Sequence, residues 1–124
     1  MNVEFLQKIG PQTFAIVWIT DTPLGPDCPH YSTFHYLLGG TLRPRERSEM
    51  GFFQGTHYGK KLFLLHTVWG KTSIAHIKQF HNLIHSHRSH KAQMVFVGKD
   101  IPCEVEDLID TRLRSEYDIV VFKY

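Results

Sequence analysis

The sequence has few of the features that would place it outside the cell or in a membrane. It has only two cysteines in 124 residues, too few for a secreted domain held together by disulfides. No stretch approaches the run of about 18 apolar residues that a membrane-spanning helix needs. The first residues, Met1–Phe5, lack the basic region and apolar run of a secretion signal. These absences predict an intracellular, cytoplasmic protein whose thiols are reduced.

The sequence also has little net charge. A formal net charge of +2 is too small to indicate nucleic-acid binding by itself. Nine histidines are present, and each gains positive charge near its usual pKa of about 6.5. Apolar residues form 42% of the chain and charged residues 21%, which is typical of a folded domain. We therefore expect one globular domain whose charge depends on pH.

The stretch from Lys61 to Gly98 predicts a strand, a helix and a second strand. Residues 61–68 and 94–98 are short apolar runs, as expected of strands covered on both faces. Between them, a helix over 72–88 would place four apolar residues on one face: Ile74, Ile77, Phe80 and Ile84. Two buried strands joined by a helix form a right-handed crossover with parallel strands.

Other segments complete the predicted domain. Apolar or β-branched runs predict further strands at 13–19, 32–38 and 119–122. A helix is predicted over 104–116 and a short one near Pro44, whereas 51–59, with three glycines, reads as an irregular connection. The first two of these strands are expected to pair as an antiparallel hairpin. The sequence thus predicts a single α/β domain over residues 1–124: a mostly parallel five-stranded sheet with an antiparallel edge hairpin and flanking helices.

Residues 73–84 and 94–98, flanked by Thr41–Met50 and Val105–Ile119, have a pattern found in a known family. They resemble the Ras-like small GTPases. Within that resemblance, 73–84 match the helix after the family's fourth strand, and 94–98 match the strand that carries its guanine-specificity motif. Residues 41–50 fall at the second switch. The resemblance covers about half of the chain and implies the family's α/β sheet.

The chain lacks the catalytic parts of that family. Its first thirty residues contain no glycine-rich loop that ends in Gly-Lys-Ser/Thr. At the second switch it reads Gly40-Thr41-Leu42-Arg43-Pro44 where the family has Asp-Thr-Ala-Gly-Gln, and only Lys99-Asp100 remains of the guanine motif. Phosphoryl transfer depends on the charges that these parts position. The resemblance therefore implies a pseudo-GTPase that needs no cofactor and binds another protein.

A second stretch ends as a phosphate-binding loop ends, in Gly70-Lys71-Thr72 followed by Ser73. A complete loop would need glycine five residues before Gly70, where the chain has Leu65. The free amides at a helix start could still hold one anion beside Lys71. These four residues are a candidate anion site, and the alternative is a helix cap with an exposed lysine.

Two histidines have the spacing of metal ligands. His81 and His85 are four residues apart, so a helix projects them from the same side, as in many zinc sites. The sequence indicates no third ligand and contains neither His-Glu-x-x-His nor Cys-x-x-Cys. They are candidate metal ligands, and the alternative is a pair of partly buried, hydrogen-bonded histidines.

Another pair of histidines suggests an enzyme. His30-Tyr31-Ser32 and His66-Thr67-Val68 resemble the paired His-x-Ser/Thr motif of two-histidine phosphoesterases, although the second lacks Ser or Thr two residues on. In that family both histidines lie on adjacent strands and act as acid and base. The alternative function is therefore a His-dependent phosphodiesterase or nuclease.

A candidate interaction surface comprises three arginines and two phenylalanines: Arg43, Arg45, Arg47, Phe52 and Phe53. Alternating arginine and glutamate also suits a solvated helix face. Together with Lys60, Lys61 and aromatic residues such as Tyr58, the arginines could instead bind nucleic acid. No complete catalytic motif occurs. The favoured hypothesis is a non-catalytic protein-interaction module, with the phosphodiesterase and a small nucleic-acid-binding protein as alternatives.

Overall fold

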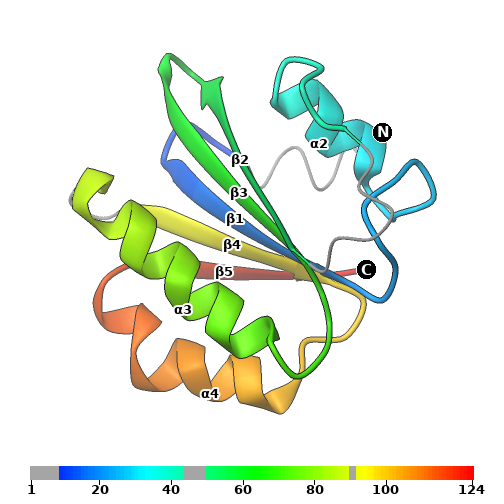
Figure 1. Ribbon diagram of the computed structural model, residues 1–124. Coiled ribbons are helices and arrows are strands. Elements are labelled where there is room, and N and C mark those ends of the chain that lie inside the picture. The colour runs from blue at the N-terminus through cyan, green and yellow to red at the C-terminus, as the bar shows by residue number, and fades with distance from the viewer. Residues whose placement is uncertain (1–8, 44–49, 90–91) are drawn as a thin grey trace.

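The computed structural model describes residues 9–43, 50–89 and 92–124. A five-stranded sheet, in the order β2-β3-β1-β4-β5, forms its centre (Figure 1). The strands are β1 (Thr13–Thr20), β2 (Met50–His57), β3 (Lys60–Val68), β4 (Gln93–Gly98) and β5 (Asp118–Lys123). The α-helices in the described part are α2 (Tyr31–Leu37), α3 (Ser73–Ile84) and α4 (Cys103–Thr111). Short 3₁₀ turns follow α3 at His85–His87 and α4 at Leu113–Ser115.

The middle strand, β1, is parallel to both of its neighbours. Ala15 lies opposite Phe63 of β3 on one side and opposite Met94 of β4 on the other. β5 extends the sheet in parallel beyond β4, and β2 adds an antiparallel strand beyond β3. Every residue of β1 is buried, because strands flank it on both sides and helices cover both faces. The predicted fold class, one mostly parallel five-stranded α/β sheet with a single antiparallel pair, is confirmed.

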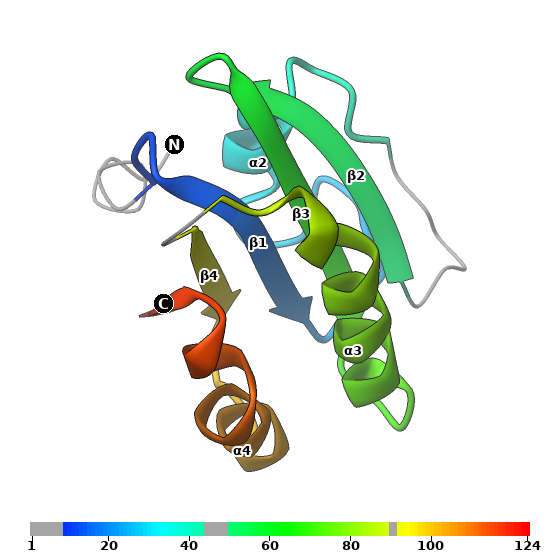
Figure 2. The same ribbon diagram turned by 90° about the vertical axis from the view of Figure 1, so that its left-hand side faces the viewer.

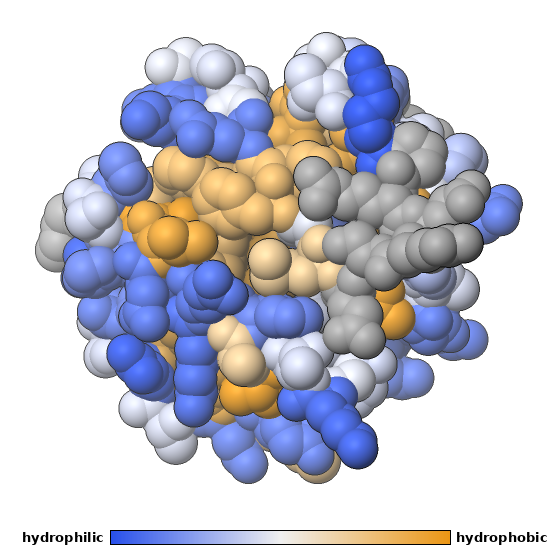
Figure 3. Space-filling model, viewed as in Figure 1, coloured by the Kyte–Doolittle hydropathy of each residue, from blue (hydrophilic) through white to orange (hydrophobic). Residues whose placement is uncertain are grey.

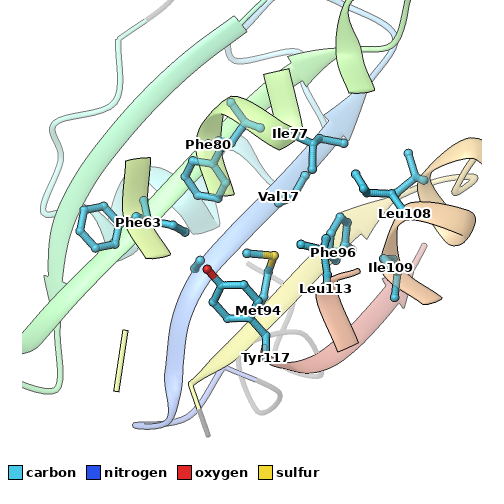
Figure 4. Close-up of a cluster of buried hydrophobic side chains, with 14 of the residues drawn as sticks. Val17, Phe63, Ile77, Phe80, Met94, Phe96, Leu108, Ile109, Leu113 and Tyr117 are labelled. Carbon is cyan, nitrogen blue, oxygen red and sulfur yellow. The ribbon is translucent and has the colours of Figure 1, made fainter. Parts of the chain in front are cut away.

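The helices divide between the two faces of the sheet. α3 and α4 cover one face and α2 lies on the other (Figures 1 and 2). Alternate residues of β1 follow this division: Val17 packs with the α3 and α4 side chains, whereas Trp18 packs with Phe34 of α2. Figure 4 shows the first of these clusters, in which side chains of α3 and α4 meet those of β1, β3 and β4. Each face of the sheet therefore has its own apolar core.

The sequence-based prediction was wrong for residues 32–38. They form helix α2, not a strand, so the expected antiparallel hairpin with 13–19 does not exist. The helix arises because Phe34 and Leu38, four residues apart, both enter the core on the α2 face, and Tyr31 packs against the same cluster. A strand would place Tyr36 on that same face, but Tyr36 is 67% exposed, so the burial follows a helical period. Tertiary packing thus overrides the β-forming residues of this segment.

The antiparallel pair is instead formed by β2 and β3, so the predicted irregular connection over 51–59 was also wrong. The strands are joined by a two-residue turn in which Tyr58 has φ +52° and Gly59 φ +73°. Two successive positive φ values are typical of the tight hairpin turns that match strand twist. Gly55 sits inside β2 because a Cβ there would lie 2.8 Å from a methyl group of Leu38. The short helix expected near Pro44 falls outside the described residues.

The other predicted elements are confirmed to within a few residues. The helix expected over 72–88 is α3 and its 3₁₀ turn, and the helix expected over 104–116 is α4 and its 3₁₀ turn. The strands expected at 13–19, 61–68, 94–98 and 119–122 are β1, β3, β4 and β5. In α3 the predicted face is also correct, since Ile77, Phe80 and Ile84 are buried against the sheet and Ile74 is partly buried.

The face of α3 can be tested by truncating its side chains. Ile77→Ala and Phe80→Ala should each lower the free energy of unfolding by about 2–5 kcal/mol, because both remove fully buried side chains. Lys78→Ala, between them on the exposed side, should change it by less than about 0.5 kcal/mol. Urea denaturation of the three variants measures this difference. Equal midpoints would show that the helix face is assigned wrongly.

Candidate functional site

The candidate anion loop lies where β3 ends and α3 begins. Ser73 is completely buried, and its Oγ accepts a hydrogen bond from the Gly70 amide (2.9 Å) and donates one to the Val68 carbonyl (3.1 Å). The Thr67 hydroxyl also donates to the Ser73 Oγ (3.2 Å). Lys71 is exposed. The serine hydroxyl therefore closes the turn before α3, and an anion at this loop would have to use the exposed lysine and the remaining backbone amides.

A cavity of about 250 Å³ opens beside this loop, at the carboxyl ends of β1, β3 and β4. The chain leaves β1 toward α2 on one face, and leaves β3 and β4 toward the other face. In α/β sheets, ligands bind at such a reversal point. The rim of this cavity carries Asp21 and Asp100 as well as Lys99, and its walls include Trp69 and Tyr124. Two carboxylates and one lysine make the rim unfavourable for a phosphate group.

His66 is buried on the α2 side of β3, close to the same edge of the sheet. The Thr20 hydroxyl donates to the Thr22 carbonyl (2.8 Å), so it accepts a hydrogen bond from the Nε2–H of His66 (2.7 Å). The His66 ring also packs on Trp18, with 4.9 Å between ring centroids. Burial lowers the pKa of His66 to about 4, because desolvation disfavours the charged imidazolium. His66 is therefore neutral near pH 7 and helps to hold β1 and β3 together.

His81 belongs to a second hydrogen-bonded group. Its Nδ1 accepts a hydrogen bond from the hydroxyl of Tyr117 (3.0 Å), and its Nε2–H donates to the Glu116 carboxylate (2.9 Å). Burial lowers the pKa of His81, while the carboxylate of Glu116 opposes that shift. Burial also raises the pKa of Tyr117 to about 12, so its hydroxyl remains a donor. These contacts join the end of α3 to the turn before β5.

The two candidate metal ligands lie beside each other, but only His85 is exposed. The centroids of the two rings are 5.6 Å apart, and both ring nitrogens of His81 already have partners. Within residues 9–43, 50–89 and 92–124, no three His, Cys, Asp or Glu side chains converge as a metal site requires. The contacts of His81 favour a structural role, and the metal site stays a prediction.

The paired-histidine arrangement required by the phosphodiesterase hypothesis is not formed. His66 lies on β3, but His30 lies on no strand: it precedes α2 with a φ of +67°. Its ring packs on Phe122 and Tyr124 at the far end of the chain, with 5.8 and 4.6 Å between centroids. The adjacent-strand arrangement of the two-histidine phosphoesterases is therefore absent here, because the segment after β1 forms helix α2.

The described part of the candidate interaction surface is split between a loop and the edge strand β2. The Arg43 guanidinium donates to the carbonyls of Gly40 (2.8 Å) and Leu42 (3.2 Å), within its own loop. Phe52 packs toward α3, with its ring 5.6 Å from that of Phe80, and Phe53 packs toward the α2 side. Both rings are half-buried. Arg45 and Arg47 lie outside the described residues.

An apolar area is exposed on the α3 side of the molecule. Figure 3 shows it between α3 and the β2–β3 hairpin. Met50 and Phe52 are only partly buried against the core on this face. The helix thus leaves part of the outer two strands uncovered, and this uncovered part adjoins the open edge of β2.

The sequence analysis missed a feature that is visible in the sequence itself. Between Met50 and Lys99 there is no aspartate or glutamate, while this stretch contains six lysines and one arginine. It also missed Tyr36, which was placed on a strand but lies on α2 and lines the same groove as Tyr58. The acid-free stretch can be found by counting acids segment by segment. The groove shared by Tyr36 and Tyr58 can be found only from the fold, because its residues come from two elements.

Comparison of the chain with models of known protein families, with curated protein sequences and with solved structures found no match. Among the residues that the structure describes, every helix is too short or too polar to cross a membrane.

The pKa of His66 makes stability depend on pH. Its folded-state pKa is about 4 and its unfolded-state pKa is about 6.5, so below pH 6.5 the unfolded chain binds more protons. The free energy of unfolding should fall by about 2 kcal/mol between pH 7.5 and pH 5 from this residue alone. Urea denaturation at matched ionic strength measures the fall.

Two variants separate His66 from the other histidines. His66→Gln keeps an N–H donor for Thr20 but cannot titrate, so it should lose most of this pH dependence. His85→Gln changes an exposed residue and should keep it. A wild-type protein equally stable at pH 7.5 and pH 5 would contradict the buried, neutral state of His66.

The hydrogen bond from Tyr117 to His81 should also contribute to stability. Tyr117→Phe leaves the buried Nδ1 of His81 without its donor, which should lower the free energy of unfolding by about 1–3 kcal/mol. Tyr36→Phe removes the hydroxyl of an exposed tyrosine and should change it by less than about 0.5 kcal/mol. Thermal or urea denaturation of both variants measures the difference, and equal effects would contradict the role of this bond.

Proposed function

We propose that the chain is a non-catalytic protein-interaction module of the Ras-like pseudo-GTPase type, and that its partner contacts the edge strand β2. The observation that carries the proposal is the state of this strand. In the described sheet β2 pairs with β3 alone, so its other edge has no neighbouring strand. Its eight residues include no lysine, arginine, aspartate, glutamate or proline. Exposed sheet edges usually carry such residues, which block pairing with another strand.

The surroundings of β2 also suit a protein partner. An extended segment added to a sheet edge gains main-chain hydrogen bonds, and it gains specificity from side chains on the two faces. Here Phe52 and Phe53 present half-buried rings on opposite faces of the edge strand. The apolar area beside α3 would give the partner further surface to cover (Figure 3).

The carboxyl edge of the sheet supports the non-catalytic part of the proposal. The Ser73 hydroxyl is engaged within its own turn, and Asp21 and Asp100 lie on the rim of the recess at that edge. A nucleoside triphosphate at this position would lie beside these carboxylates. It would lack the lysine and backbone amides that neutralise phosphates in a complete phosphate-binding loop. The residues that resemble the family lie mainly on α3, β4 and the elements that follow. Their side chains pack in the apolar core and are not placed to contact a phosphate.

The pseudo-GTPase assignment predicts that the protein does not bind GTP usefully. Calorimetric titration with GTP and magnesium should show no dissociation constant below about 10 μM. Tighter binding would contradict the proposal, because it would require a phosphate site that the carboxyl edge does not provide.

The use of β2 can be tested in cells with a photo-crosslinking amino acid. At position 54, where Gln54 is exposed on β2, it should form discrete adducts with a partner protein. At position 104, where Glu104 is exposed on α4, it should not, because α4 lies near β5, at the edge of the sheet opposite β2. Adducts of equal intensity at both positions, or none at position 54, would contradict the proposed interface.

A further inference from the structure

Among the described residues, acidic side chains lie on elements other than β2, β3 and α3, whereas Glu46 and Glu49, just before β2, lie outside the described residues. The stretch from Met50 to Lys99 has no acidic residue. The acids that the structure describes lie in the loop after β1 or from Asp100 onward: Asp21, Asp27, Asp100, Glu104, Glu106, Asp107, Asp110, Glu116 and Asp118. Because the sheet order places β2 and β3 at one edge and β5 at the other, the edge with the hairpin is positive and the edge with α4 and β5 carries the acids. Such asymmetry favours an anionic partner at the hairpin edge.

Two exposed tyrosines flank a groove at this positive edge, on the α2 side of the sheet. Tyr36 of α2 is 67% exposed, and Tyr58, at the tip of the β2–β3 hairpin, is 65% exposed. Between them lies a hollow of about 430 Å³ that is also lined by Thr56 and His57. A second hollow, of about 470 Å³, adjoins it at Tyr36. Exposure of a single tyrosine is unremarkable, but two that share one groove form a surface for stacking.

The backbone around these rings is open and carries little side-chain bulk. The second hollow is lined by Gly39 and Gly40, and Gly59 follows Tyr58 in the turn. Several carbonyls at the end of α2 already accept hydrogen bonds, including those of His35 and Leu38. Few carbonyl oxygens at this end of α2 are therefore free to face the groove and repel an anion.

Positive charge for a ligand is present in the same place. Lys60 directly follows the turn, is exposed and lies opposite His57 on the α2 face, whereas the exposed Lys61 lies on the α3 face. The rings of His57 and His35 line the two hollows, although their unpartnered nitrogens, Nε2 and Nδ1, are buried. The groove thus combines aromatic faces with positive charge.

We propose that this groove binds single-stranded nucleic acid, with bases stacked on Tyr36 and Tyr58 and phosphates near Lys60. Stacking on aromatic rings beside a positive surface is how proteins hold single strands without reading their sequence. A duplex would not fit this chemistry, because its base faces are already stacked. An acidic peptide would use the lysine but would leave both rings without a flat partner.

This groove adjoins the protein interface proposed above, because Thr56 and His57 belong to β2. Its two stacking residues, Tyr36 and Tyr58, lie outside β2. Their substitution therefore tests the groove separately from the crosslink at position 54.

The test is fluorescence anisotropy with labelled oligouridine and oligothymidine of about 12 nucleotides, at about 50 and about 200 mM salt. The wild-type protein should bind both single strands, more weakly at the higher salt concentration. Tyr36→Ala and Tyr58→Asn should each weaken binding about five-fold or more. Asparagine is chosen at position 58 because it tolerates a positive φ.

Conservative and distant variants complete the test. Tyr36→Phe and Tyr58→Phe keep the rings and should bind as the wild type does. Lys60→Gln should reduce the salt dependence, whereas Lys61→Gln and Lys78→Gln, both on the α3 side, should leave affinity unchanged to within about two-fold. Circular dichroism and thermal melting confirm that each variant is folded.

Three outcomes would overturn the proposal: no binding of either single strand at the lower salt concentration, equal binding of the tyrosine variants and the wild type, or equal binding of a duplex of the same length. Displacement of the oligonucleotide by polyglutamate at an equal concentration of charges would also overturn it, in favour of an acidic protein segment.

Discussion

The rest of the structure depends on the burial of β1 on both faces. Every side chain of this strand is buried, and alternate residues enter two separate cores, one under α3 and α4 and the other under α2. Because β3 and β4 pair with it on its two sides, the carboxyl ends of three parallel strands meet at one edge. The same arrangement leaves β2 and β5 as the two edge strands, whose side chains are less constrained by the core.

The crossover from β3 through α3 to β4 was predictable because its pattern is strong. Ile77, Phe80 and Ile84 repeat with a helical period between two apolar runs, and only one packing of such a unit is common. Residues 32–38 were not predictable in this way, because tyrosine, threonine and phenylalanine suit a strand locally. Their helix is stabilised by Phe34 and Leu38 against Trp18 and its neighbours, contacts that join distant parts of the chain.

The candidate sites differ in how far the sequence determines them. The turn at Gly70–Ser73 was correctly placed at the start of α3, and His81 and His85 near its end. Their hydrogen bonds depend on Val68 and on Tyr117 and Glu116, which no local pattern identifies. The groove of Tyr36 and Tyr58 was not predictable from the sequence, since Tyr36 was predicted on a strand and lies on helix α2. The absence of acids from Met50 to Lys99, in contrast, can be read from the sequence alone. The sheet order is needed to place β2 and β3 at one edge and the acids of α4 and β5 at the other.

The central claim is that β2 is an uncharged edge strand whose outer side is open in the free protein. Hydrogen–deuterium exchange followed residue by residue by NMR tests it most directly. The amides of β1 should all exchange slowly, and those of β2 should alternate, with protected amides facing β3 and rapidly exchanging amides facing outward. Uniform protection along β2 would show that another segment covers its edge. Uniformly rapid exchange would show that β2 is not a stable strand, and either result would contradict the account.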